Sequence, residues 1–174
     1  MLTTLRNHSN KQPSNDNNQN SNKDIAVPNT FVVYRPGLIK DLKVQNRYIL
    51  MGIKLVLEKI TSGDLGLIRE LLVRVQRMIM SQFMKEQNLL YLYVKTATKN
   101  NPAKQSLIKT VKREMSCVDS TLFMFFNTYL NTRLTHKHLP AMRRELYVIG
   151  KTLLWSFGRK EKELYSMYTA PQLA

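Results

Sequence analysis

The sequence predicts an all-α fold, an antiparallel up-down-up-down four-helix bundle with a disordered N-terminal tail. Apolar residues recur at steps of three or four along four long segments, the spacing that lines one face of a helix. Short links containing glycine, proline or asparagine separate these segments. Amphipathic helices joined by short links pack most simply with each helix antiparallel to the next. No strand pattern, internal repeat or glycine-rich phosphate loop competes with this interpretation.

Residues 1–29 are predicted to be a disordered polar tail, and residues 30–174 to be the bundle. The tail is rich in Asn, Ser, Gln and Lys and has few large apolar side chains, so it buries too little surface to offset the entropy of ordering. We expect Phe31–Tyr34 to be an apolar anchor at the start of the domain. Pro36 then opens the first helix, because proline suits the first turn.

The boundaries of the helices follow from stop and start signals. Ser62 and Gly63 end the first helix, and Asp64 is a typical N-cap for the second. Pro102 breaks the pattern before the third helix, and Pro140 precedes the fourth. The predicted helices span about residues 37–61, 65–98, 103–134 and 141–168.

Composition indicates the compartment and the class of partner. The single cysteine, Cys117, excludes an internal disulfide framework, and its position on an apolar segment predicts a small buried thiol in a reducing compartment. The N-terminus lacks the apolar region of a signal peptide, and no run approaches the roughly 20 apolar residues of a membrane span. We therefore expect a cytoplasmic protein. Its net charge of +15 favours an anionic partner: nucleic acid, lipid head groups or an acidic protein surface.

Polar residues interrupt the apolar stripes at one level of the predicted bundle. A buried carboxylate without a partner costs several kcal/mol, so Glu86 needs a metal, a cation from another helix, or water. The pairs Gln82/Glu86 and Ser156/Lys160 have the i, i+4 spacing that bundles use for paired metal ligands. The residues predicted at this level are Asn46, Gln82, Glu86, Ser156 and Lys160, together with the apolar Met115 on the third helix.

Two motifs resemble the hemerythrin-like (HHE) family of four-helix bundles. The second and fourth helices of that family each carry a His-Phe-x-x-Glu-Glu-x-x-Leu-Tyr type motif, and this chain has QFMKEQNLLY at 82–91 and SFGRKEKELY at 156–165. The family's histidines on helices one and three would fall near Asn46 and Met115. The resemblance covers roughly residues 31–170 and implies the same bundle, which in the family holds iron through histidines and two bridging carboxylates.

The residues at the family's ligand positions argue against iron in this chain. None of them is a histidine, and the second carboxylate is replaced by Lys160. Glu86 alone cannot hold a di-iron centre. The histidines are His8 in the tail and His136 and His138 in the link before the fourth helix, which we expect to be exposed. We therefore predict no cofactor.

The first motif also resembles the Rsd/AlgQ family of bacterial regulators, which bind the housekeeping sigma factor. Their Arg-Phe-x-x-Glu-Asp-like signature is similar to QFMKEQ at 82–87. The resemblance implies a regulatory protein that acts on transcription through a sigma factor. This inference is an analogy between folds.

Our hypothesis for the interior is that Lys160 replaces the metal. Its ammonium would bond Glu86, while Gln82, Asn46 and Ser156 would satisfy the remaining donors and acceptors. The alternative is that Lys160 extends to solvent and Glu86 bonds to water.

Further residues are assigned to packing rather than to chemistry. Ser156 has no histidine near it in the predicted interior, so nucleophilic catalysis is unsupported and we predict no enzyme. Aromatic residues on the third and fourth helices are predicted to pack in the core or at the bundle end. They are Phe123, Phe125, Phe126, Tyr129 and Trp155.

Six basic residues around the second link are the candidate contact for an anionic partner: Lys95, Lys99, Lys104, Lys109, Lys112 and Arg113. No DNA-reading motif accompanies them. We predict a metal-free regulatory or interaction protein with an acidic partner. Two alternatives stay open: a hemerythrin-like binder of iron or oxygen, and a basic protein that binds nucleic acid through phosphates.

Overall fold

The protein is all-α, as the periodicity predicts. The computed structural model describes residues 24–28 and 30–171. Most of them belong to long helices, and two very short strands precede the helices. In chain order the elements are β1 (Ile25–Ala26), β2 (Val33–Tyr34), α1 (Leu38–Ser62), α2 (Leu65–Lys85), the π-helical turn η1 (Glu86–Tyr91), α3 (Leu92–Ala97), α4 (Pro102–Leu130), the 3₁₀ turn η2 (His136–His138), α5 (Leu139–Glu163) and the 3₁₀ turn η3 (Tyr165–Met167).

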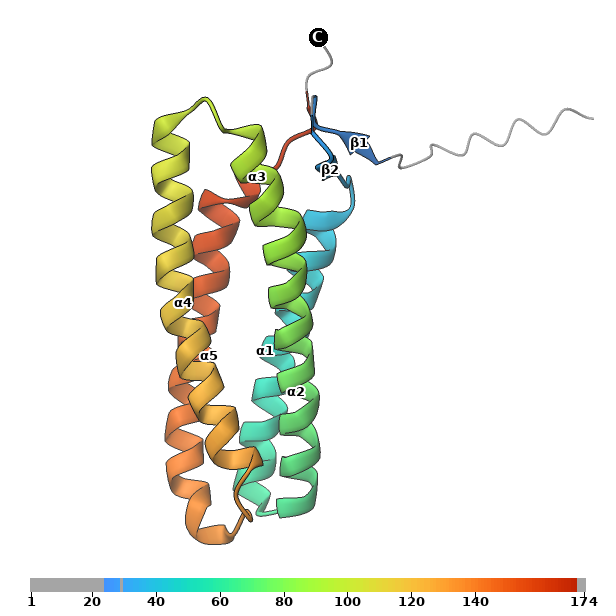
Figure 1. Cartoon of the computed structure of the whole chain (residues 1–174). Helices are drawn as coiled ribbons and strands as arrows, with labels where there is room; N and C mark the ends of the chain where they lie inside the picture. The colour runs from blue at the N-terminus through green and yellow to red at the C-terminus, as the bar shows by residue number, and fades with distance from the viewer. Residues whose placement is uncertain (1–23, 29, 172–174) are drawn as a thin grey trace, which may run out of the picture.

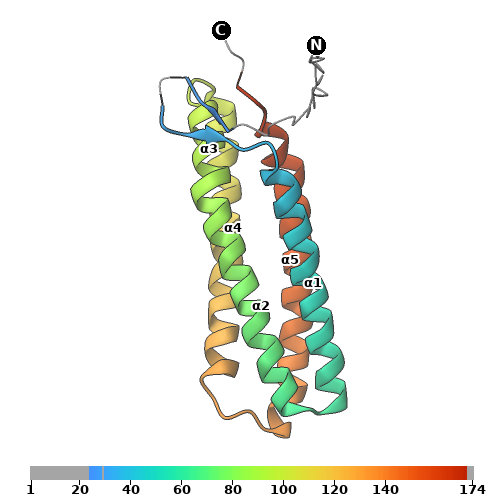
Figure 2. The same ribbon diagram turned by 90° about the vertical axis from the view of Figure 1, so that its right-hand side faces the viewer.

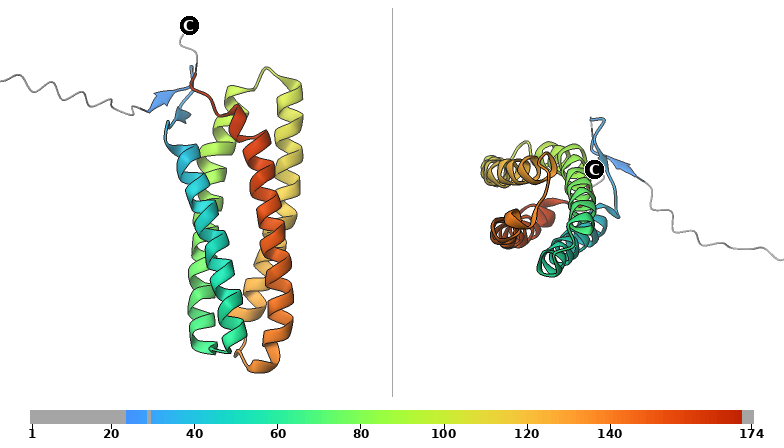
Figure 3. Two further views of the ribbon diagram at one scale, coloured as in Figure 1. Left: turned by 180° about the vertical axis from the view of Figure 1, so that it is seen from behind. Right: turned by 90° about the horizontal axis from the view of Figure 1, so that it is seen from below.

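The long helices lie side by side along one common direction (Figure 1). The α1–α2 and α4–α5 links lie at one end, and the α3–α4 link lies at the other. Helix α1 packs against α2 and α5, and α4 packs against α5 and α2. Seen along the axes, the helices surround a common interior (Figure 3). Among the described helices, none has the length and apolar character needed to cross a membrane.

Local signals set the ends of the helices. Gly63 has a φ of 75°, a left-handed conformation that closes α1 and is favoured by glycine. The Asp64 side chain then accepts a hydrogen bond from the Leu67 N–H at 3.0 Å, which caps α2. Asn101 caps α4 in the same way by accepting from the Lys104 N–H at 3.0 Å. Two residues therefore suffice to connect α1 to α2.

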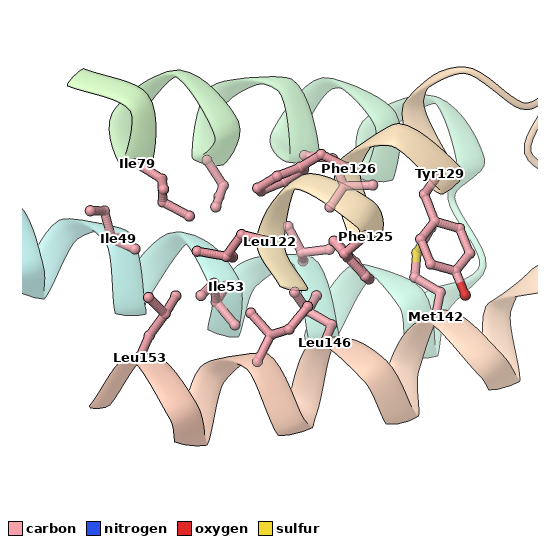
Figure 4. Packing of buried hydrophobic residues seen from close by; sticks show 14 of the residues in the cluster. Ile49, Ile53, Ile79, Leu122, Phe125, Phe126, Tyr129, Met142, Leu146 and Leu153 are labelled. Atoms are coloured by element: carbon pink, nitrogen blue, oxygen red, sulfur yellow. The ribbon is translucent and has the colours of Figure 1, made fainter. Parts of the chain in front are cut away.

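The interior contains two apolar clusters separated by a polar level. The larger cluster fills the half nearer the α1–α2 link and includes Ile49, Ile79 and Leu146 (Figure 4). The smaller cluster lies toward α3 and includes Leu42 and Leu90. In the sequence, Asn46 on α1, Gln82 and Glu86 in the second helical segment and Lys160 on α5 fall between residues of the larger and the smaller cluster.

Several sequence-based boundaries need correction. The second helix was predicted to be continuous, but it contains the π-helical turn η1. Helix α4 ends at Leu130 rather than near residue 134, and the Arg69 guanidinium donates to the carbonyls of Leu130 and Thr132 at this end. Helix α5 begins at Leu139 and ends at Glu163, so its predicted last turn is a 3₁₀ turn instead.

The segment before α1 also differs from the prediction. Ile25 pairs with Tyr34 and Ala26 with Val33 in a short antiparallel ladder, so residues 25–26 of the predicted disordered tail form a strand. The strands lie across the end of the molecule that holds α3 (Figure 2). Phe31 is fully exposed and does not anchor the domain. The rest of the predicted tail, residues 1–23 and 29, lies outside the described residues.

Three side chains predicted to be buried are exposed. Cys117 is exposed, and Phe123 and Trp155 are 73% and 54% exposed. Each lies one or two positions away from a buried residue of its helix, and a step of one position turns a side chain by about 100° around the axis. The segments are apolar, as predicted, but these three side chains face outward. The predictions for Phe125, Phe126 and Tyr129 are confirmed, since all three are buried.

Candidate functional site

A buried ion pair lies at the polar level of the interior. The Lys160 Nζ on α5 is 2.7 Å from both carboxylate oxygens of Glu86 at the start of η1. The two side chains are 2% and 4% exposed. The ammonium therefore meets Glu86 in the interior, as the hypothesis predicts, and the alternative in which Lys160 extends to solvent is wrong.

Glu86 has further hydrogen-bond donors on other elements. The Gln82 amide donates to Glu86 Oε1 at 3.1 Å and to Asn46 Oδ1 at 2.7 Å. The Tyr165 hydroxyl donates to the same Glu86 oxygen at 3.5 Å. A buried carboxylate surrounded by donors and a cation is electrostatically satisfied, which a lone carboxylate would not be. Three helical segments and η3 are thus joined through Glu86.

Ser156 and Met115 form a separate contact. The Ser156 hydroxyl donates to the Met115 sulfur at 2.7 Å. The hypothesis that Ser156 would help satisfy the ion pair is therefore wrong. The Lys160 Nζ instead lies 5.0 Å from the centroid of the Phe157 ring, within the range of a cation–π interaction. The residue after Ser156, rather than Ser156 itself, contributes to the environment of the ammonium.

The π-helical turn brings two consecutive residues into the interior. Both Leu90 and Tyr91 are buried together with Glu86. Consecutive side chains on a regular helix diverge by about 100°, and the i→i+5 pattern of a π turn widens the helix locally, so that more residues share its inward side. Such turns occur frequently at functional sites. Here the turn places the Tyr91 phenol beside the ion pair.

A small cavity adjoins the ion pair. Its volume is about 10 Å³, and Glu86, Tyr91, Asp119, Ser156 and Lys160 are among its lining residues. A space of this size holds about one water molecule. Within the described residues, the Tyr91 hydroxyl, the Asn46 amide nitrogen and the Gln82 amide oxygen are buried without a protein partner. This level of the interior is therefore polar, and the cavity beside the ion pair is too small for anything larger than water.

Asp119 is a member of this site that the sequence analysis missed. It lies on α4, half-buried, and lines the cavity. Burial raises the pKa of its carboxyl to about 6; Lys160 opposes this rise and Glu86 adds to it. Asp119 follows Met115 at i+4, the same spacing as Gln82/Glu86 and Ser156/Lys160. That repeated spacing was the available signal for it.

The neighbouring tyrosines are held in their neutral form. Burial is the main cause that raises the pKa of the Tyr91 and Tyr165 phenols, and the charge of Glu86 raises both further. Both phenols therefore keep their protons over the ordinary pH range, and the Tyr165 hydroxyl donates to Glu86. The site as a whole combines one ammonium, two carboxyl groups and two phenols.

The donor set does not suit a transition metal. Among the described residues, no group of three or more His, Cys, Asp or Glu side chains is placed to hold a metal ion. Both Glu86 oxygens already bond Lys160. His136 is exposed in η2, where His138 Nδ1 accepts from the Thr135 N–H at 3.1 Å; neither lies at the polar level. His8 lies outside the described residues.

The six basic residues predicted to contact an anionic partner lie on the surface, whereas the ion pair lies in the interior. The six residues are exposed on α3, the α3–α4 link and the first half of α4: Lys95, Lys99, Lys104, Lys109, Lys112 and Arg113. None of them forms an ion pair with a carboxylate of the described residues. Lys112 Nζ lies 6.0 Å from the centroid of the Tyr91 ring. The six positive charges are therefore free of ion pairs within the described residues.

Comparison of the chain with protein-family models, with curated proteins and with solved structures finds no match.

Proposed function

We propose that this protein is a non-catalytic, metal-free regulatory or interaction module that binds a partner with an acidic surface. The observation that carries the proposal is the bond between Lys160 and Glu86 in the closed interior. An ammonium there supplies a fixed positive charge, so the carboxylate needs no metal ion. Chemistry on a substrate would need an accessible space, and the cavity beside the pair is about one water molecule in size.

Iron does not fit the residues at this level. Non-haem iron is held by imidazole and carboxylate ligands, and the polar level offers amides, a thioether, a hydroxyl and the carboxyl groups of Glu86 and Asp119. A metal would also have to displace Lys160 from Glu86, leaving a second cation in the same space. We infer that the level has a structural role.

We also propose the arrangement of the helices that the sequence predicts, an antiparallel four-helix bundle. An up-down-up-down antiparallel bundle agrees with the alternation of the links between the two ends. The resemblance of QFMKEQ at 82–87 to the Rsd/AlgQ signature supports a cytoplasmic regulator of transcription, with a sigma factor among the candidate partners. The resemblance to hemerythrin-like proteins supports a frame whose metal ligands have been replaced.

The surface supports an acidic partner. The chain has a net charge of +15, and the six basic residues from Lys95 to Arg113 are exposed. Charges of one sign on a surface steer partners of opposite sign and give binding that weakens with salt. Phosphates would satisfy the same charges, so the experiment must separate an acidic polypeptide from nucleic acid.

The test compares two polyanions. We expect the purified full chain to contain no stoichiometric iron, and to bind poly-L-glutamate in a salt-dependent manner but more tightly than duplex DNA of arbitrary sequence. Changing Lys104, Lys109 and Lys112 to Glu should weaken poly-L-glutamate binding about tenfold. The charge-matched control changes Lys40, Arg47 and Lys54, exposed on α1, to Glu and should weaken it far less.

Two results would overturn the proposal. Stoichiometric iron with charge-transfer absorption would support the hemerythrin-like alternative. Tighter binding to DNA, with a steep loss of affinity as salt rises, would support the nucleic-acid alternative.

A further inference from the structure

The outer surface between α4 and α5 contains a groove of about 510 Å³. Phe125 and Ile149 line the groove, and both are buried residues of the larger apolar cluster of the interior. Met124 and Val148 line it from the two helices and are 68% and 59% exposed. The groove is therefore an apolar opening in the seam between two helices.

The outer face of α5 extends this apolar surface. Trp155 follows Val148 at i+7, and Leu154 follows Tyr147 at i+7, so each pair lies on one side of the helix two turns apart. All four side chains are more than half exposed. Exposed apolar side chains concentrated in this way on one helix are a feature of interaction sites. Trp155 therefore belongs to this exposed face and not to the core.

Most polar side chains that line the groove already have hydrogen-bond partners within the protein, so few are available to a small polar ligand. Thr121 and Thr128 donate their hydroxyls to carbonyls of their own helix, so their methyl groups contribute to the lining. Glu145 accepts a hydrogen bond from the Tyr129 hydroxyl at 3.0 Å. The groove therefore offers apolar contact along its length rather than a set of directed hydrogen bonds.

This face carries two positive charges, Arg144 and Lys151, beside the single carboxylate of Glu145. Arg144 lines the groove, and Lys151 lies between the two turns that carry the exposed apolar pairs. Neither forms an ion pair with a carboxylate of the described residues, and Lys151 Nζ lies 4.6 Å from the centroid of the Tyr147 ring. A second copy of this +15 chain would bring like charges together. A partner with acidic residues beside an apolar stripe would offset them.

The spacing of the exposed residues favours a helix as the partner. A groove between two helices accepts the ridges of a third helix, whose apolar residues recur at i, i+3, i+4 and i+7. From Arg144 to Trp155 the face extends for about 17 Å along α5, which corresponds to about three turns of a partner helix.

We propose that the groove between α4 and α5 binds an amphipathic helix of an acidic partner protein, with the apolar stripe of that helix in the groove and its acidic residues against Arg144 and Lys151. This inference rests on the proposed function and names the class of partner and its docking surface. The basic residues from Lys95 to Arg113 would steer the same partner toward the molecule.

The probe is a fluorescent synthetic peptide of about 20 residues, long enough to form a helix, with Leu and Phe on one face and Glu on the others. Its binding to the full chain is measured by anisotropy. Val148→Asp and Arg144→Glu should each weaken binding about tenfold. The matched controls Leu55→Asp and Arg47→Glu make the same changes at exposed positions of α1, and should alter it less than about twofold.

Trp155 gives an independent readout, because it is the single tryptophan of the chain and lies on the proposed face. Its emission should shift to shorter wavelength on addition of the peptide. A peptide of the same composition, scrambled so that the apolar residues share no helical face, should give no shift and weaker binding.

The outcomes separate the two proposals. Equal losses in the groove variants and the controls would overturn the groove while leaving an acidic partner in place. Failure of both this peptide and poly-L-glutamate to bind would overturn the proposed function as well. A dimer that Val148→Asp converts to a monomer in sedimentation would show that a second copy covers the groove, and would overturn this inference.

Discussion

The same four long helices hold two kinds of interior packing. Around Leu146, apolar side chains fill the space, and their contribution depends on the area that each removes from water. Around Glu86 and Lys160, two opposite charges are buried together, and each is tolerated because the other is present. Removing one residue therefore has different consequences in the two regions. In the apolar cluster the loss is local, whereas at the polar level it leaves an uncompensated charge.

The largest effect should come from breaking the ion pair on one side. Lys160→Met removes the ammonium and leaves Glu86 ionised in the interior, so the free energy of unfolding should fall by about 3–5 kcal/mol. Chemical denaturation at neutral pH measures this loss. A change of less than about 1 kcal/mol would mean that Glu86 is compensated by solvent, which contradicts its burial.

A somewhat smaller effect is expected in the apolar cluster. Leu146→Ala removes a fully buried side chain and leaves a cavity, so the free energy of unfolding should fall by about 2–5 kcal/mol. The loss caused by Lys160→Met should be reduced when Glu86 is also neutralised, whereas the loss caused by Leu146→Ala should not. Combining Leu146→Ala with Glu86→Gln and measuring denaturation checks this, because distant sites should give additive losses.

The smallest predicted effect concerns Asp119 and depends on pH. Its ordinary pKa is 3.8, and burial raises it to about 6 in the folded protein, so the folded state holds the proton more tightly than the unfolded state. The contribution of Asp119 to stability therefore falls as pH rises from about 4 to about 6. Asp119→Asn should remove this fall and stabilise the protein at pH 7 by about 1 kcal/mol, a value reduced for the screening of a half-buried group.

Urea denaturation of both proteins at intervals between about pH 4 and pH 7 measures this difference. Parallel stability curves for the parent and Asp119→Asn would contradict the prediction. They would indicate that the Asp119 carboxyl is as well solvated in the folded protein as in the unfolded chain.

The part of the site that the sequence predicted depends on periodicity. Gln82 and Glu86 follow the inward stripe of their helix, and Lys160 follows that of α5, so the ion pair could be anticipated from two helices alone. For Asp119 the sequence carries only the i+4 spacing from Met115, a weak signal because Asp119 lies at the margin of its stripe and the packing of α4 leaves it half-buried. The same limit applies to Trp155, which is apolar yet faces outward.

The π-helical turn is the feature of the fold that periodicity conceals. Steps of three or four residues account for the burial of Glu86 and Leu90. They do not predict that Tyr91 is buried as well, because this depends on the extra residue in the π turn. The contacts of Ser156 were also misjudged, since a hydroxyl can bond a thioether as well as an ammonium. The helices and their buried faces could be predicted from the sequence. Which side chains bond one another within a buried face could not, because this depends on differences in distance of a few ångströms.

The central claim is that Lys160 and Glu86 stabilise the interior as a unit in place of a metal. A double-mutant cycle with Lys160→Met, Glu86→Gln and the combination tests it most directly, with the free energy of unfolding as the readout. We expect each single change to cost several kcal/mol, and the double change to cost much less than either alone. Additive losses would contradict the claim, because they would mean that the two side chains contribute independently.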